Sequence, residues 1–226
     1  MNQIDLKIER KISKGKNITL TVYQNGKVIL KHPARISKIQ LDSFLAEKHN
    51  WILNKLNKLP KNIPKSLKFM EGESLPIFGE ILPIFLNEKN TILLPDRGFY
   101  VRHEKNDLIR LKKAKSYLKS ILLEKINPLV HKYESNLNTK VKKLTIRTMR
   151  SLWGSCNSKN YISINLSLIH CPDFIIEYIV LHEIAHTIQH NHSQKFWNIV
   201  KSQNPNYKVA EKWLKDTGKT YIYYLN

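Results

Sequence analysis

Two histidines and one glutamate stand together in the segment His182-Glu183-Ile184-Ala185-His186. Histidines four residues apart lie on the same face of a helix, about 6 Å apart, so both can bind one metal ion. Glu183 lies beside them, where a carboxylate can take a proton from a metal-activated water. The segment therefore predicts a metal-dependent hydrolase with Glu183 as the catalytic acid or base.

A catalytic zinc ion usually has three protein ligands and one open position for water. Candidates for the third ligand are His190, His192 and Glu211. His192 follows His182 by ten residues, the offset of the third histidine in the metzincin pattern. That pattern has a glycine midway for a turn, and Gln189 takes its place here. We favour His192, on this geometry together with the resemblance described below. The expected ion is Zn²⁺, although another divalent metal would suit the same donors.

A second segment, Trp153-Gly154-Ser155-Cys156, lies on a turn between two predicted strands, 141–147 and 161–165. Glycine permits close approach of backbone or substrate, and Ser155 can donate a hydrogen bond. Cys156 is either a soft metal ligand or a small packed side chain, and packing is the favoured interpretation. The candidate substrate-binding residues are Arg150, Trp153, Ser155 and Asn165.

These motifs resemble the YgjP-like metallopeptidases, relatives of the SprT-like zinc proteins. The resemblance is specific over residues 147–214 and depends on the order and spacing of four blocks, which are Arg150 with Trp153-Gly154-Ser155-Cys156, Ile164-Asn165-Leu166, the His-Glu-x-x-His segment, and Asn191-His192-Ser193 with Phe196-Trp197. It extends more weakly over most of the chain. It implies a zincin-like C-terminal domain with His182, His186 and His192 as ligands and Glu183 as catalytic residue. The family usually has arginine directly before the tryptophan, where this chain has Leu152, so Arg147 or Arg150 would have to supply that charge.

The predicted elements belong to an α+β fold. Alternating apolar residues predict strands within 4–31, with a hairpin turn at Asn25-Gly26. A capping box at Ser37 begins a helix that ends at Pro60. Short strands follow over 68–102, and then a helix over 107–133 that is kinked or ended near Pro128.

The helix that carries the histidines begins at Pro172 and is expected to bury one apolar face, formed by Phe174, Tyr178, Leu181, Ala185 and Ile188. Helices beginning at Ser193 and Asn204-Pro205 follow. We predict two regions: a β-rich N-terminal region with one helix, residues 1–103, and a zincin-like, mostly helical, metal-binding catalytic domain, residues 104–226.

The charge is strongly positive. The chain has 38 Lys and Arg against 18 Asp and Glu, a formal net charge of +20, and 31 of the basic residues lie in residues 1–150. Such a surface attracts nucleotides and nucleic acid, although the many lysines also fit compositional drift. The expected substrate is a peptide or protein. The alternatives are a nucleoside triphosphate pyrophosphatase, an activity to which some YgjP-like proteins have been linked, and a SprT-like protease held on DNA by the basic N-terminal part.

Length and composition fit an ordinary globular protein. The 226 residues suffice for one large domain or two small ones, and 42% of them are hydrophobic. No apolar run approaches the roughly 18 residues that span a bilayer, and no signal peptide is visible. Two cysteines are too few for a disulfide framework, so the expected location is the cytoplasm.

Overall fold

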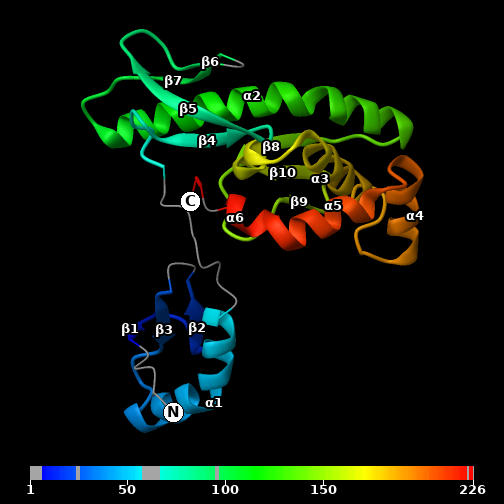
Figure 1. Ribbon diagram of the computed structural model, residues 1–226. Helices are drawn as coiled ribbons and strands as arrows, with labels where there is room; N and C mark the ends of the chain where they lie inside the picture. Colours follow the sequence, from blue (N-terminus) through cyan, green and yellow to red (C-terminus); the bar gives the residue numbers. More distant parts are fainter. Residues whose placement is uncertain (1–6, 24–25, 58–66, 95–96, 223, 226) are drawn as a thin grey trace. The chain divides into compact units, whose positions relative to one another are not determined.

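The computed structural model describes residues 7–23, 26–57, 67–94, 97–222 and 224–225. The chain divides into two compact units, Met1–Ile63 and Pro64–Asn226 (Figure 1). The predicted boundary between residues 103 and 104 falls inside the second unit. A separate catalytic domain that begins at residue 104 therefore stays a prediction.

The first unit is a small sheet with one helix. Its elements are β1 (Ile8–Ile12), β2 (Thr19–Val22), β3 (Val28–His32) and α1 (Lys38–Asn57), and the strand order is β1-β3-β2. β2 and β3 form the predicted antiparallel hairpin, and β1 pairs with β3 in parallel. The capping box is confirmed, because the Gln40 backbone N–H donates to Ser37 Oγ at 3.2 Å and the Ser37 N–H donates to Gln40 Oε1 at 3.1 Å. Asn25 and Pro60 lie outside the described residues.

The second unit holds all the candidate site residues. Its elements are β4 (Ser74–Ile77), β5 (Glu80–Asn87), β6 (Ile92–Leu94), β7 (Gly98–Arg102), α2 (Asp107–Asn136), β8 (Lys143–Arg147), β9 (Gly154–Cys156), β10 (Tyr161–Asn165), η1 (Leu166–His170), α3 (Asp173–Ala185), α4 (Gln194–Gln203), α5 (Tyr207–Trp213), η2 (Leu214–Gly218) and α6 (Lys219–Ile222). β4 to β7 form a sheet of order β4-β5-β7-β6 that shares its core with α2. The α+β fold class is therefore confirmed.

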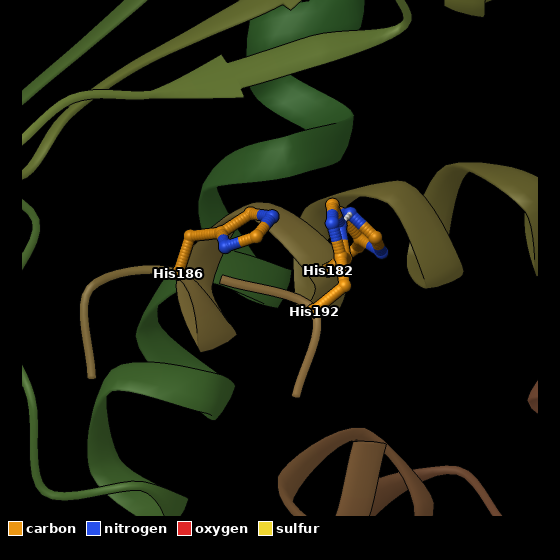
Figure 2. A group of neighbouring side chains, drawn as sticks. All are labelled: His182, His186 and His192. Atoms are coloured by element: carbon orange, nitrogen blue, oxygen red, sulfur yellow. Dashed lines mark hydrogen bonds between the residues drawn. The ribbon is translucent and has the colours of Figure 1, made fainter. Parts of the chain in front are cut away.

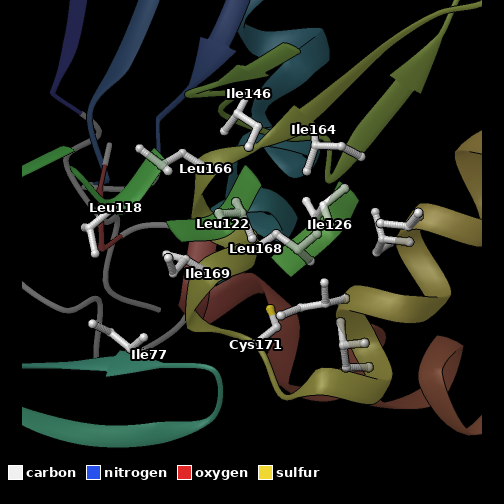
Figure 3. Close-up of a cluster of buried hydrophobic side chains, with 14 of the residues drawn as sticks. Ile77, Leu118, Leu122, Ile126, Ile146, Ile164, Leu166, Leu168, Ile169 and Cys171 are labelled. Carbon is white, nitrogen blue, oxygen red and sulfur yellow. The ribbon is translucent and has the colours of Figure 1, made fainter. Parts of the chain in front are cut away.

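The sheet nearest to the site has the order β8-β10-β9, so β9 is an edge strand. β10 runs parallel to β8 and antiparallel to β9. Ile146, Ile162 and Ile164 on its inner face are buried in the core with Leu122 and Ile126 of α2 (Figure 3). Because successive side chains of a strand point to opposite faces, the polar residues of the same strands lie on the outer face.

Helix α3 is buried on more than the one face expected from its sequence. It packs against α2, α4, α5 and the β8-β10-β9 sheet, so Ile175, Ile176 and Val180 are also buried. Phe174 and Ile188, predicted to lie in the core, are exposed, and the helix ends at Ala185 before Ile188 is reached. The prediction of a single apolar face was wrong, because neighbours surround most of the helix.

Helix α2 runs through Pro128 to Asn136, so the proline does not end it. Pro128 has no backbone N–H, so the carbonyl four residues earlier lacks its helical hydrogen bond. Pro128 is exposed, so water can donate to that carbonyl. Although α2 has 30 residues, its many lysines make it too polar for a bilayer. No helix within the described ranges combines the length and the apolar character needed to cross a membrane.

Stability is expected to fall in acid because of His170. This histidine is fully buried, and its Nδ1 lies 2.6 Å from the Pro76 carbonyl oxygen. Burial lowers the pKa of His170 from 6.5 to about 4. The unfolded chain therefore binds the proton more readily. The free energy of unfolding is full above pH 6.5 and falls as the pH drops towards 4, by about 3 kcal/mol from this residue.

Urea denaturation at pH 7 and pH 4.5 measures this effect. We expect His170→Gln to show a clearly smaller loss of stability between the two pH values than the wild type. His103→Gln changes an exposed histidine and should retain the wild-type loss. Equal losses in all three proteins would show that His170 does not control the acid sensitivity.

Candidate metal centre

Three imidazoles converge at the C-terminal end of α3. His182 lies on the last turn of the helix, His186 is its C-cap, and His192 lies in the loop before α4 (Figure 2). The Nε2 atoms of His182 and His192 are 3.0 Å apart. One ring nitrogen from each histidine lies within 4.8 Å of those of the other two. Each ring can therefore direct one nitrogen at a common point.

The turn that brings His192 back is made without glycine. Backbone N–H groups of Thr187, Ile188 and Gln189 donate to carbonyls of Ile184 and Ala185, which closes the end of the helix. Gln189 is not among the described residues with positive φ. The Asn191 side-chain oxygen then accepts from Gln189 Nε2 at 2.7 Å and from the Ser193 N–H at 3.3 Å. Hydrogen bonds thus replace the glycine of the metzincin pattern.

Hydrogen bonds on the far side of two rings fix their orientation. His186 Nδ1 lies 3.1 Å from the Gln189 carbonyl oxygen, so Nδ1 donates and Nε2 keeps its lone pair. His182 Nδ1 lies 3.4 Å from the Tyr178 hydroxyl. Both rings therefore present Nε2 to the common point, the arrangement that metal-binding histidines usually have.

Aromatic side chains of α4 pack against the three rings. Phe196 is fully buried and stacks on His186 with ring centroids 4.5 Å apart. Trp197 stacks on His192 at 5.8 Å and on Tyr207 at 5.3 Å. Phe196 and Trp197 both belong to the fourth of the sequence blocks described above. In the structure they also hold the imidazoles in place.

The Glu183 side chain lies against Gly154 of β9. A Cβ atom at position 154 would come within 2.6 Å of Glu183 Cγ and Cδ, so only glycine leaves room for this carboxyl group. Glu183 is 5% exposed, and burial raises its pKa to about 8. Burial, with the neighbouring His186 and His192, lowers the pKa of His182 to about 3. His182 is therefore neutral at pH 7, the state that binds metal.

A cavity of about 420 Å³ opens over these groups. It is lined by the three histidines and Glu183, by residues 151–156, and by Tyr178, Ile179, His190 and Leu214. Trp153 and Ser155, two of the predicted substrate-binding residues, are thus part of the cavity lining. Arg150 is exposed and lies outside the lining.

Asn165 has a different position from the one expected of a substrate-binding residue. It is fully buried, and its Nδ2 donates to the carbonyls of Met149 and Leu152, both at 2.7 Å. Its Oδ1 accepts from the N–H groups of Met149 and Ser167. Asn165 therefore holds the segment that lines the cavity and cannot itself reach a substrate.

Cys156 lines the cavity without joining the group of possible metal ligands. Burial, followed by the charge of Glu183, raises the pKa of the Cys156 thiol to about 11. A thiol that stays protonated at neutral pH is a poor ligand. Glu211 does not belong to the group either. The charge of this carboxylate adds to the effect of burial in raising the pKa of Tyr178.

The donor set fits a divalent transition metal such as zinc. Three imidazoles with a cavity beside them correspond to an open type of site, in which one position remains for water or substrate. A bound cation would also favour the carboxylate form of Glu183 against the effect of burial. His182, His186 and His192 would hold the ion.

Sequence reasoning considered His190 only as a possible ligand, and it missed Tyr178, Ile179 and Leu214 as parts of the cavity wall. Tyr178 could have been found, because it lies four residues before His182 and so on the same helical face. Leu214 could not, since only the packing of α5 and η2 places it there.

Tyr178→Phe is expected to lower metal affinity roughly 10- to 100-fold. The change removes the hydroxyl next to His182 Nδ1 and leaves the ring in place. Metal competition with a chromophoric chelator measures the affinity. Tyr207→Phe is the control, because that ring stacks on Trp197 and lies outside the cavity lining. Unchanged affinity in the Tyr178 variant would show that the hydroxyl does not support His182.

The family model for the YgjP-like metallopeptidase domain matches residues 16–217. No curated protein matches the chain. A solved structure, the metallopeptidase zymogen of Pyrococcus abyssi abylysin, is 20% identical and covers 42% of this chain and 96% of its own, with a TM-score of 0.38. Because the family model matches most of its length, the chain belongs to the YgjP-like metallopeptidase family.

Proposed function

We propose that this protein is a zinc-dependent metallopeptidase with Glu183 as its general base. The observation that supports this most strongly is the position of Glu183, which lies buried against Gly154 in a cavity lined by all three histidines. The natural substrate on this proposal is a peptide or protein.

The bound ion would supply Lewis acidity, lowering the pKa of a coordinated water towards about 7 and polarising a carbonyl oxygen. Glu183 would take the proton from the attacking water and pass it to the leaving amine. Burial raises the pKa of Glu183. A general base is most effective when its pKa lies near the working pH, so the buried position favours this transfer. Ser155 lines the cavity, and its predicted contact with the substrate stays part of this proposal.

The free edge of β9 offers a means of holding the substrate. Only β10 pairs with β9 in the described sheet. An extended peptide can add to such an edge through backbone hydrogen bonds, which are independent of side-chain sequence. This arrangement would place a peptide next to Gly154 and Glu183.

The test combines metal analysis with a substrate panel. We expect about one zinc ion per chain and hydrolysis of casein, with both lost after chelation and both regained with zinc. Release of pyrophosphate from nucleoside triphosphates, with casein intact, would instead favour the pyrophosphatase. Casein hydrolysis that requires DNA, with salt-sensitive retention on DNA, would favour the DNA-associated protease. The charge of +20 is the observation behind both alternatives.

Gly154→Ala is expected to lower kcat roughly 10²-fold with normal zinc content. The new methyl group would overlap the Glu183 carboxyl, and a flexible side chain yields before the backbone does. Displacing the base by about 1 Å accounts for a loss of this size. Kinetics on a peptide substrate provide the measurement. Gly15→Ala adds a methyl group with its nearest atom at 3.7 Å and should be neutral. An active Gly154 variant would mean that the carboxyl does not need this position.

A further inference from the structure

A second cavity lies on the outer face of the β8-β10-β9 sheet. It has a volume of about 300 Å³. Lys143, Thr145 and Arg147 alternate along β8, so their side chains share one face. Tyr161 and Ser163 of β10 stand opposite Lys143 and Thr145, and Ser155 of β9 stands opposite Ser163. We call this the outer-face cavity. All six of these residues line it.

The outer-face cavity is positively charged. Lys143 and Arg147 are cationic, and the lining contains no carboxylate. Neither cation takes part in an ion pair with a described residue, and both are exposed. Between them, Thr145 Oγ1 and Ser163 Oγ lie 3.1 Å apart and provide hydroxyl groups. The two residues are four positions apart on one strand, which separates their backbones by about 13 Å. Two long cationic side chains with hydroxyls between them form a surface suited to an anionic group.

The outer-face cavity adjoins the metal cavity at β9. Ser155 and Cys156 line both, and Gly154 immediately before them contacts Glu183. An extended peptide along the free edge of β9 would alternate its side chains between the two faces of the sheet. A residue that points outward beside Ser155 would therefore approach the outer-face cavity while its neighbours lie near Glu183.

We propose that the outer-face cavity binds a carboxylate of the peptide substrate through Arg147 and Lys143, and that it gives the enzyme a preference for acidic peptides. The inference depends on the proposed function. Arginine suits the role, because its planar guanidinium can bind a carboxylate with two parallel hydrogen bonds. The carboxylate could be that of an Asp or Glu side chain or of the substrate C-terminus, and the test separates these sources.

The test measures peptide binding by full-length, zinc-loaded protein carrying Glu183→Gln, which should prevent turnover. Fluorescence anisotropy compares three labelled peptides. The first has internal glutamates and an amidated C-terminus. The second has glutamines in place of the glutamates and is neutral, and the third is the second with a free C-terminal carboxylate. We expect at least one carboxylate peptide to bind roughly tenfold more tightly than the neutral peptide. The preference should decrease between 50 and 200 mM salt, because the cations are exposed. Which peptide gains affinity identifies the source of the carboxylate.

Adding Lys143→Gln and Arg147→Gln should abolish the preference and leave zinc content unchanged. The matched control is Lys112→Gln with Lys119→Gln, which removes the same charge from exposed positions of α2 and should retain the preference. Equal binding of all three peptides would overturn the inference. So would an equal loss of the preference for carboxylate peptides in both double variants. Tighter binding of tripolyphosphate than of any peptide, dependent on Arg147, would also overturn it, because the anion would then be a phosphate. Failure of the wild type to cleave any peptide would contradict the proposed function separately.

Discussion

Glu183→Gln is expected to reduce peptide hydrolysis roughly 10²- to 10⁴-fold, the usual contribution of a general base. The amide has nearly the same shape as the carboxyl and fits beside Gly154. It cannot accept the proton of the attacking water. Because Glu183 is not one of the three candidate ligands, zinc content should stay near one per chain. Steady-state kinetics and metal analysis of the same sample test both statements.

Glu124→Gln is the control for this prediction, since it makes the same chemical change at an exposed position of α2. It should retain wild-type kcat and KM. Substantial activity in the Glu183 variant would exclude this carboxylate as the base. Loss of zinc together with activity would instead indicate that Glu183 supports the ion.

His182→Ala is expected to lower zinc affinity more than roughly 100-fold. Loss of a residue that only hydrogen-bonds a ligand costs roughly 10- to 100-fold, and this change removes a ligand itself. It removes one of three imidazoles and leaves a two-histidine site, below the three protein ligands of a catalytic zinc ion. At zinc concentrations that saturate the wild type, the His182 variant should be inactive. Titration against a chelator gives the affinity, and circular dichroism verifies the fold.

His190→Ala is the matched control, because His190 lines the same cavity but does not belong to the converging group. It should bind zinc as tightly as the wild type. If His190→Ala lost zinc and His182→Ala kept it, the assignment of ligands would be wrong.

The spacing of the motifs was enough to predict that His182, His186 and His192 lie close together. Helical periodicity alone places His182 and His186 on one side, and the offset of His192 predicts a returning loop. The structure has that loop, built from hydrogen bonds of Asn191 where glycine was expected. The α+β class, the β2-β3 hairpin and the Ser37 capping box also follow from local patterns that depend on few neighbours.

Features that depend on packing between distant segments were not predictable. Asn165 looked like a substrate contact, yet its amide is used by backbone groups of Met149, Leu152 and Ser167. The contact of Gly154 with Glu183 joins a strand and a helix that are 29 residues apart in sequence. Helix α3 looked amphipathic, because periodicity cannot show how many neighbours surround a helix.

We propose that three imidazoles bind one ion beside Glu183. Anomalous diffraction at the zinc edge, from crystals of the zinc-loaded protein, tests it most directly. We predict one strong peak about 2.0–2.1 Å from a ring nitrogen of each of His182, His186 and His192, with the Glu183 carboxylate outside the coordination sphere. A peak bound by other residues, or no peak at these histidines, would contradict the claim.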